Sequence, residues 1–101
     1  MMKTDLISAE FEIGKEPKKI QLWRLDVLNH SDHQLGLLIA KVDYELVQIL
    51  HPGDRIKGMA VYSEWAMIKT DATVKNIKKI NQGVYKDKCI LGMESMELLK
   101  L

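Results

Sequence analysis

The sequence predicts an all-β fold, a small antiparallel barrel or sandwich, from its short apolar runs and the turns between them. Runs of alternating or continuous apolar residues recur along the chain, and polar or glycine-containing turns separate them. Helical periodicity is scarce, so few helices are expected to cover a sheet. With 101 residues, of which 47% are hydrophobic, the chain can build one small core. We therefore expect a single domain over residues 1–101.

The first half of the chain contains three expected strands. Glu10–Ile13 alternates polar and apolar residues, and a polar turn over residues 15–19 follows it. Ile20–Val27 alternates again, and Leu35–Ala40 is a continuous apolar run typical of a buried strand. Residues 41–50 fit a helical period and a strand period equally, so we interpret them as an irregular crossover.

The second half begins with a turn at Pro52-Gly53, because proline presets φ and glycine accepts a positive φ, as a type II turn requires. Arg55–Tyr62 and Trp65–Lys75 are expected to pair as a hairpin. A turn at residues 81–83 would then lead into a last strand, Val84–Leu91.

Charge and cysteine content narrow the function classes. A formal net charge of +1 gives no electrostatic reason to expect nucleic acid or an anionic membrane as the main partner. No apolar run reaches membrane-spanning length, and the first residues lack the apolar stretch of a signal peptide. Cys89 is the only cysteine, which excludes an intramolecular disulfide. We expect a cytoplasmic protein without membrane insertion.

Catalytic and metal-binding motifs have little support. The histidines and Asp32 within residues 30–33 form one dense segment, and no further cysteine or histidine cluster completes a metal site. Cys89 lies in an apolar run, where a thiol is poorly reactive, and no nucleophile-elbow pattern surrounds the serines. The most basic stretch, residues 75–79, is best interpreted as a solvated strand face. We therefore expect no metal, no catalytic residue and no enzymatic activity.

The most informative segment is residues 29–36, Asn-His-Ser-Asp-His-Gln-Leu-Gly, which joins two expected strands. Its Asn-x-Ser loop, the glycine opening the next strand, the following Pro-Gly-Asp turn and the late hairpin resemble the PilZ domain family in their order. The resemblance covers residues 23–97, with Cys89–Glu94 as the final strand, and it implies a six-stranded antiparallel β-barrel. The tail Glu94–Leu101 has high helix propensity, so a short C-terminal helix is expected if the tail packs against the barrel.

The resemblance also implies a ligand. Typical PilZ domains are bacterial signalling modules that bind the nucleotide cyclic di-GMP and pass its level to a partner. An Arg-x-x-x-Arg arm before the barrel grips guanine edges and phosphates, while an Asp/Asn-x-Ser-x-x-Gly loop hydrogen-bonds a guanine. Arginine suits this task, because its planar fork can bind both phosphate and the guanine O6/N7 edge with two hydrogen bonds.

This chain departs from both motifs. Asn29 and Ser31 match the loop, but Gln34 stands where the glycine is expected, and Gly36 comes two residues late. No arginine stands where the arm should lie, since the only arginines are Arg24 and Arg55. Three lysines in the first expected turn cannot form the guanidinium fork: Lys15, Lys18 and Lys19.

Three hypotheses follow. The leading one is a PilZ-like regulatory adaptor that acts through a protein partner or as a homodimer, with weak or no cyclic di-GMP binding. The second is a genuine cyclic di-GMP receptor with a non-standard grip, in which Asn29, Ser31 and Gly36 hold a guanine and Arg24, Lys15, Lys18 or Lys19 meets phosphate. The third is an unrelated OB- or SH3-like barrel that binds protein or nucleic acid. The methionines and leucines of residues 93–101 would favour the adaptor if they are exposed.

Overall fold

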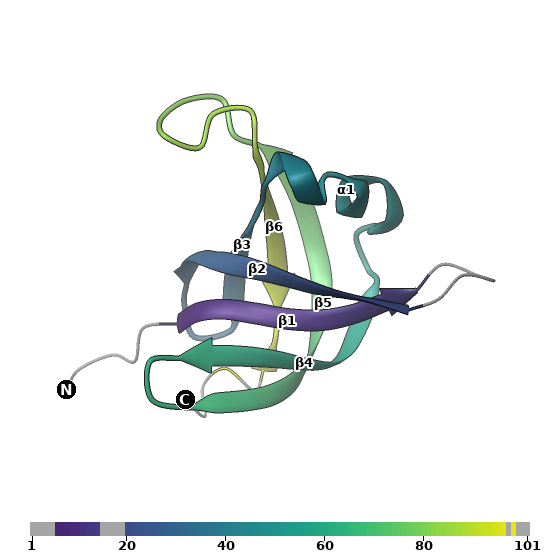
Figure 1. Cartoon of the computed structure of the whole chain (residues 1–101). Helices are drawn as coiled ribbons and strands as arrows, with labels where there is room; N and C mark the ends of the chain where they lie inside the picture. Colours follow the sequence, from purple (N-terminus) through teal and green to yellow (C-terminus); the bar gives the residue numbers. More distant parts are fainter. Residues whose placement is uncertain (1–5, 15–19, 97, 99–101) are drawn as a thin grey trace.

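A computed structural model describes residues 6–14, 20–96 and 98, and these form a closed six-stranded antiparallel barrel with the strand order β1-β2-β3-β6-β5-β4 (Figure 1). The expected six-stranded all-β barrel is confirmed. The bounds of its strands are β1 (Leu6–Gly14), β2 (Ile20–His30), β3 (Gln34–Ile39), β4 (Arg55–Ser63), β5 (Met67–Lys79) and β6 (Cys89–Glu94).

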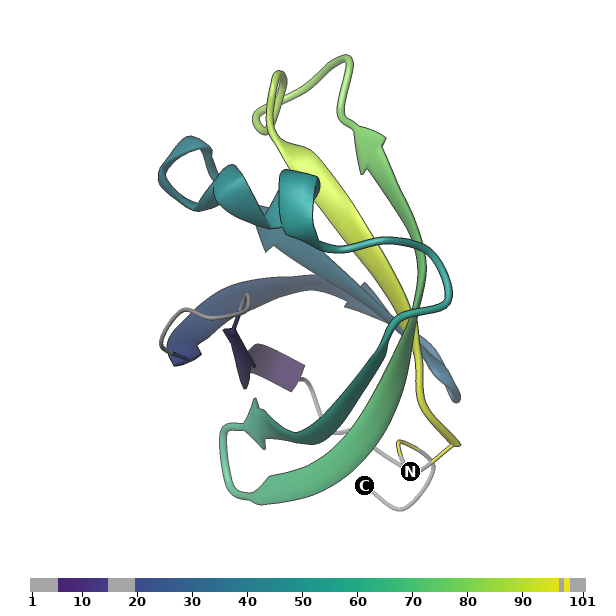
Figure 2. The same ribbon diagram turned by 90° about the vertical axis from the view of Figure 1, so that its right-hand side faces the viewer.

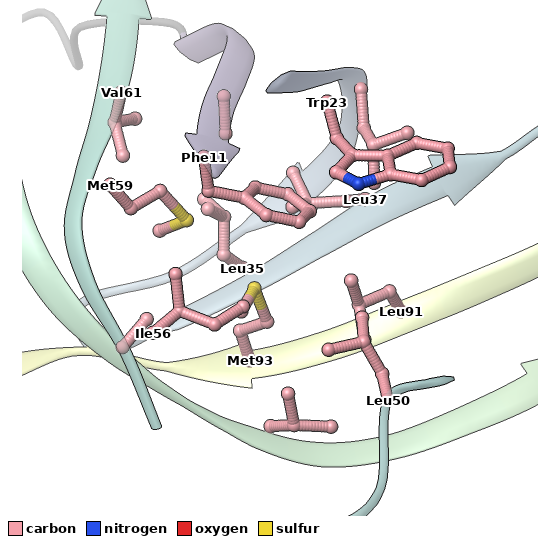
Figure 3. Close-up of a cluster of buried hydrophobic side chains, with 14 of the residues drawn as sticks. Phe11, Trp23, Leu35, Leu37, Leu50, Ile56, Met59, Val61, Leu91 and Met93 are labelled. Carbon is pink, nitrogen blue, oxygen red and sulfur yellow. The ribbon is translucent and has the colours of Figure 1, made fainter. Parts of the chain in front are cut away.

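Alternation along the strands separates the core from the surface. In β2, Trp23 and Leu25 are buried, while Arg24 between them is exposed. β3 and β6 contribute side chains at the centre of the core that are almost completely buried. Figure 3 shows these side chains in one cluster with Phe11, Trp23 and Met59 of the other strands. The labelled members of this cluster are Phe11, Trp23, Leu35, Leu37, Leu50, Ile56, Met59, Val61, Leu91 and Met93.

The segment between β3 and β4 is helical. A 3₁₀ turn, η1 (Lys41–Asp43), leads into the short helix α1 (Glu45–Ile49), whose Leu46 is fully buried. Figure 2 shows this segment at one end of the barrel. The turn expected at Pro52-Gly53 is confirmed, because Gly53 has φ +96° and the Asp54 N–H donates to the His51 carbonyl at 3.0 Å.

Two expected elements are wrong. The last strand begins at Cys89, as the resemblance implied, and not at Val84, because Gly83 and Asp87 adopt positive φ in the preceding turn. This turn is closed by hydrogen bonds from the Ile80 N–H to the Lys88 carbonyl and from the Asp87 N–H to the Ile80 carbonyl. The short helix is mid-chain, not C-terminal: Glu94, where the tail helix was expected to begin, still belongs to β6. Residues 97 and 99–101 of that tail lie outside the described part of the chain.

Candidate functional site

The Asn-x-Ser loop connects β2 to β3 through a tight turn. The Ser31 N–H donates to the Gln34 carbonyl at 2.9 Å, and Ser31 and Asp32 are exposed. The His30 ring is held by the barrel, because its Nε2 accepts a hydrogen bond from the Leu6 N–H at 3.5 Å. The loop therefore presents the Ser31 side chain from a defined backbone position.

Four residues on four strands form one line across the outside of the barrel. Asn29 of β2 pairs with Gly36 of β3, Gly36 pairs with Gly92 of β6, and Gly92 pairs with Asn76 of β5. We name this line the Asn–Gly row. It consists of two adjacent strand positions without side chains, flanked on each side by a carboxamide.

A β-bulge turns each asparagine to the outside. The pairing of β2 with β3 shifts between Val27 and Asn29, and the pairing of β5 with β6 shifts between Val74 and Asn76. Without these shifts, strict alternation from Val74, which is fully buried, would direct Asn76 into the core. With the shift, Asn76 is exposed and Ile77 packs against the core instead.

The glycines make room for the asparagine side chains. A Cβ at Gly36 would lie 2.5 Å from Asn29 Oδ1, and a Cβ at Gly92 would lie 2.7 Å from Asn76 Oδ1. The carboxamides of Asn29 and Asn76 thus occupy the space that a side chain at Gly36 or Gly92 would fill. Within the described residues neither carboxamide forms a hydrogen bond, and both side chains are exposed. A carboxamide carries donors and an acceptor side by side, which is the pattern that reads a nucleobase edge.

Lysine, not arginine, is the cation beside the row. Lys75 lies at the β5 bulge and forms an ion pair with Glu94, with 3.6 Å between Nζ and Oε1. Both side chains are about half exposed, so the pair contributes little to stability and a phosphate could displace the carboxylate.

The two arginines are held elsewhere. Arg24 reaches across β1, with its Nη1 3.6 Å from Glu10 Oε2 and its guanidinium 5.7 Å from the centre of the Tyr62 ring. Tyr62 donates a hydrogen bond to Glu10 at 2.9 Å, and this bond is the main reason that the pKa of Tyr62 is raised. Arg55 pairs with Asp71, with 3.7 Å between Nη2 and Oδ2.

A cavity of about 440 Å³ opens beside the barrel end of β5 and β6. Its lining includes Arg55 and Asp71, already paired with each other, together with Lys69. The hydroxyls of Thr70 and Ser95 lie 2.5 Å apart beneath it and are buried. The lining also includes Glu94, the carboxylate that pairs with Lys75 beside the Asn–Gly row.

The structure thus gathers three of the residues that the sequence predicted, Asn29, Ser31 and Gly36, at one end of the Asn–Gly row. Arg24 instead lies on the side of β2 that faces β1. Lys15, Lys18 and Lys19 lie outside the described residues. Sequence reasoning missed Asn76 and Gly92, although a glycine inside a strand is a signal for close approach of another group.

Comparison with known proteins adds to this geometry. Neither a family model nor a curated protein matches the sequence. Among solved structures, the chain is similar to the PilZ domain with c-di-GMP of YcgR from Escherichia coli, with a TM-score of 0.61. The match covers 92% of this chain and 70% of that one, at 15% sequence identity.

The barrel has a PilZ fold. The expected PilZ-like architecture is therefore confirmed. At 15% sequence identity, the similarity supports a shared fold and not a shared ligand or partner. In the part of the chain that the structure describes, no helix is long and apolar enough to cross a membrane.

Proposed function

We propose that this chain is a non-catalytic regulatory module of bacterial cyclic di-GMP signalling in the cytoplasm, a single PilZ-like domain that acts through protein contacts. In this proposal, cyclic di-GMP binds weakly or not at all. The PilZ fold supports the signalling context, since the similar domain of YcgR is described with c-di-GMP. The incomplete grip supports the adaptor role.

The observation that carries this proposal is the position of the two arginines. Arg24 and Arg55 are the only guanidinium groups in the chain, and each is paired with a carboxylate away from the loop at residues 29–33. Each is also anchored in a strand, so it cannot move to the loop without breaking the barrel. Lysine can supply charge but not the two-pronged contact to a guanine edge.

Exposed apolar side chains supply surfaces for a partner or a second copy. Trp65, in the turn between β4 and β5, is 86% exposed, and Met96 is 67% exposed. The C-terminal apolar residues that favoured an adaptor are divided, because Met93 and Leu98 belong to the core. Among the members of this group that the structure describes, Met96 is therefore the one that can meet a partner.

Isothermal titration with cyclic di-GMP, with GTP as the control, tests the proposal. We expect no heat of binding and no thermal shift at micromolar ligand. A dissociation constant in the micromolar range or below, not shared by GTP, would overturn the adaptor role as stated and favour the receptor.

A second candidate function, a cyclic di-GMP receptor with a non-standard grip, is favoured by the two unpaired carboxamides. Asn29 and Asn76 would bind a guanine over the glycines, and Lys75 would meet phosphate. Asn29→Ala and Ser31→Ala would then each weaken binding by roughly 1–3 kcal/mol, if a desolvated polar partner is left unmatched. Asn81→Ala, in the exposed β5–β6 turn, is the matched control. Equal affinity in all variants would remove the row from the binding site.

A further inference from the structure

The connection between β5 and β6 (residues 80–88) projects from one end of the barrel, as Figure 1 and Figure 2 both show. Val84 near its tip is 91% exposed, and the adjacent Tyr85 is 41% exposed. The turn is held by its own backbone, since the Asp87 N–H donates to the Ile80 carbonyl at 2.9 Å. An aliphatic and an aromatic side chain are thus presented to the surroundings from an ordered turn.

The projection and the end of β5 that leads into it carry more lysines than acids, although the whole chain is nearly neutral. Residues 75–88 contain five lysines and one acid, whereas the net charge of the chain is +1. Lys79 pairs with Asp87 at 3.9 Å, and Lys75 pairs with Glu94. Within the described residues the other three, Lys78, Lys86 and Lys88, have no ion-pair partner. Lys88 instead lies 5.6 Å from the centre of the Tyr85 ring.

The neighbouring η1 turn extends the same end of the barrel. Ile39 pairs with Cys89, which in turn pairs with Lys79, so η1 begins beside the base of the projection. Within η1, Val42 is 87% exposed. Asp43 and Glu45 follow it and Lys41 precedes it, so two acids stand against Lys41 and the three lysines of residues 75–88 that have no ion-pair partner.

We propose that this end of the barrel docks on an anionic lipid surface, with the lysines facing the headgroups and Val84 and Tyr85 entering the interface. The positive charge of the lysines and the exposure of Val84 and Tyr85 both favour an anionic lipid surface as the partner. Lysines near a negative leaflet each add to binding, and aromatic rings are favoured at the membrane–water boundary. A nucleic acid would use the lysines but would gain little from a valine at the tip, because its exposed backbone is charged. An acidic protein is distinguished from a lipid surface by the experiment below. The binding is peripheral and crosses no bilayer.

Vesicle co-sedimentation tests the charge component. The full chain is mixed with vesicles of phosphatidylcholine alone or of equal parts phosphatidylcholine and phosphatidylglycerol. We expect binding only to the anionic vesicles, and a loss when salt is raised from about 0.1 M to about 1 M, where screening shortens from ~10 Å to ~3 Å. Replacing the three lysines Lys78, Lys86 and Lys88 by glutamine should lower partitioning by about 100-fold. Two lysines elsewhere, Lys57→Gln with Lys69→Gln, form the control and should retain binding.

A second pair of variants tests the apolar component at constant charge. Val84→Ser with Tyr85→Ser should lower partitioning by about tenfold, because these side chains leave water on binding. Leu22→Ser removes an apolar side chain of β2 that is 58% exposed and should have no effect. All altered side chains are at the surface. Circular dichroism is used to check that each variant keeps the barrel fold. Equal binding to both vesicles, or unchanged binding by the lysine variant, would overturn the proposal. So would capture by soluble polyglutamate with no dependence on Val84 and Tyr85.

Discussion

Replacing Gly92 by alanine tests the geometry of the Asn–Gly row. The new Cβ would meet three atoms of one neighbour, at 2.7 Å from Asn76 Oδ1, 3.3 Å from its Cγ and 3.6 Å from its Nδ2. These atoms are the far end of an exposed side chain, so the carboxamide can turn away while the strand stays in place. We expect Gly92→Ala to fold and to displace Asn76.

The change in the free energy of unfolding caused by Gly92→Ala is the sum of two opposing effects. Moving a side chain about 30° from its preferred rotamer costs about 0.5–1.5 kcal/mol. Alanine also reduces the conformational entropy of the unfolded chain, which stabilises the fold by about 0.4–1 kcal/mol where the backbone accepts it. Gly92 is not among the glycines with positive φ, so its backbone does accept alanine. The expected net change in the free energy of unfolding is within about 1 kcal/mol.

Urea denaturation of a small variant set measures this prediction. Gly58→Ala is the contrasting control, because a Cβ there has open space but φ is +66°, a left-handed conformation that costs alanine about 1–2 kcal/mol. The crowded glycine should therefore tolerate alanine better than the open one. In the double variant Asn76→Ala with Gly92→Ala, any cost of the alanine at position 92 should disappear. A loss above about 2 kcal/mol for Gly92→Ala that Asn76→Ala does not relieve would refute the contact between these two residues.

Three further outcomes follow from the same structure. The hydrogen bond to Glu10 raises the pKa of Tyr62 in the folded state, so the stability that this bond contributes is present below pH 10 and is lost as the pH rises through the raised value. Tyr62→Phe should remove this alkaline loss of stability, measured by denaturation at a series of pH values. An unchanged pH profile in the variant would contradict the prediction. Leu91→Ala should cost about 2–5 kcal/mol, because Leu91 is fully buried at the centre of the barrel, and a loss below about 1 kcal/mol would contradict the packing. Met96→Ser should leave stability within about 0.5 kcal/mol and weaken association with a partner or second copy, measured by sedimentation, whereas unchanged association would exclude Met96 from that surface.

The barrel could be predicted because its strands follow local rules. Alternation marked β2, a continuous apolar run marked β3, and the Pro52-Gly53 turn has the geometry that its residues favour. The short helix α1 could not be distinguished from a strand, because the period of residues 41–50 fits both. What decides it is the burial of Leu46 against the rest of the core, a contact between distant segments.

Half of the candidate site was hidden from the sequence for a similar reason. Asn29 belongs to a local motif, but Asn76 joins it only through pairing across β3 and β6. Its outward direction further depends on a bulge at Lys75, which simple alternation does not reveal. The strand expected from Val84 was wrong, because the prediction gave the β propensity of residues 84–85 more weight than the turn signal of Gly83. In the structure Val84 is exposed and has no core packing to hold it in a strand.

We propose that the chain retains the PilZ fold but lacks the arginine arm with which typical PilZ domains bind cyclic di-GMP. The most direct test is a titration of the isotope-labelled chain with cyclic di-GMP, followed by backbone and side-chain amide chemical shifts. We expect no saturation at micromolar ligand, and we expect any shifts at higher ligand concentration to be confined to the loop at residues 29–33 and to Gly36, Gly92 and Asn76. Saturation at micromolar ligand would contradict the claim, as would shifts centred on residues away from the Asn–Gly row.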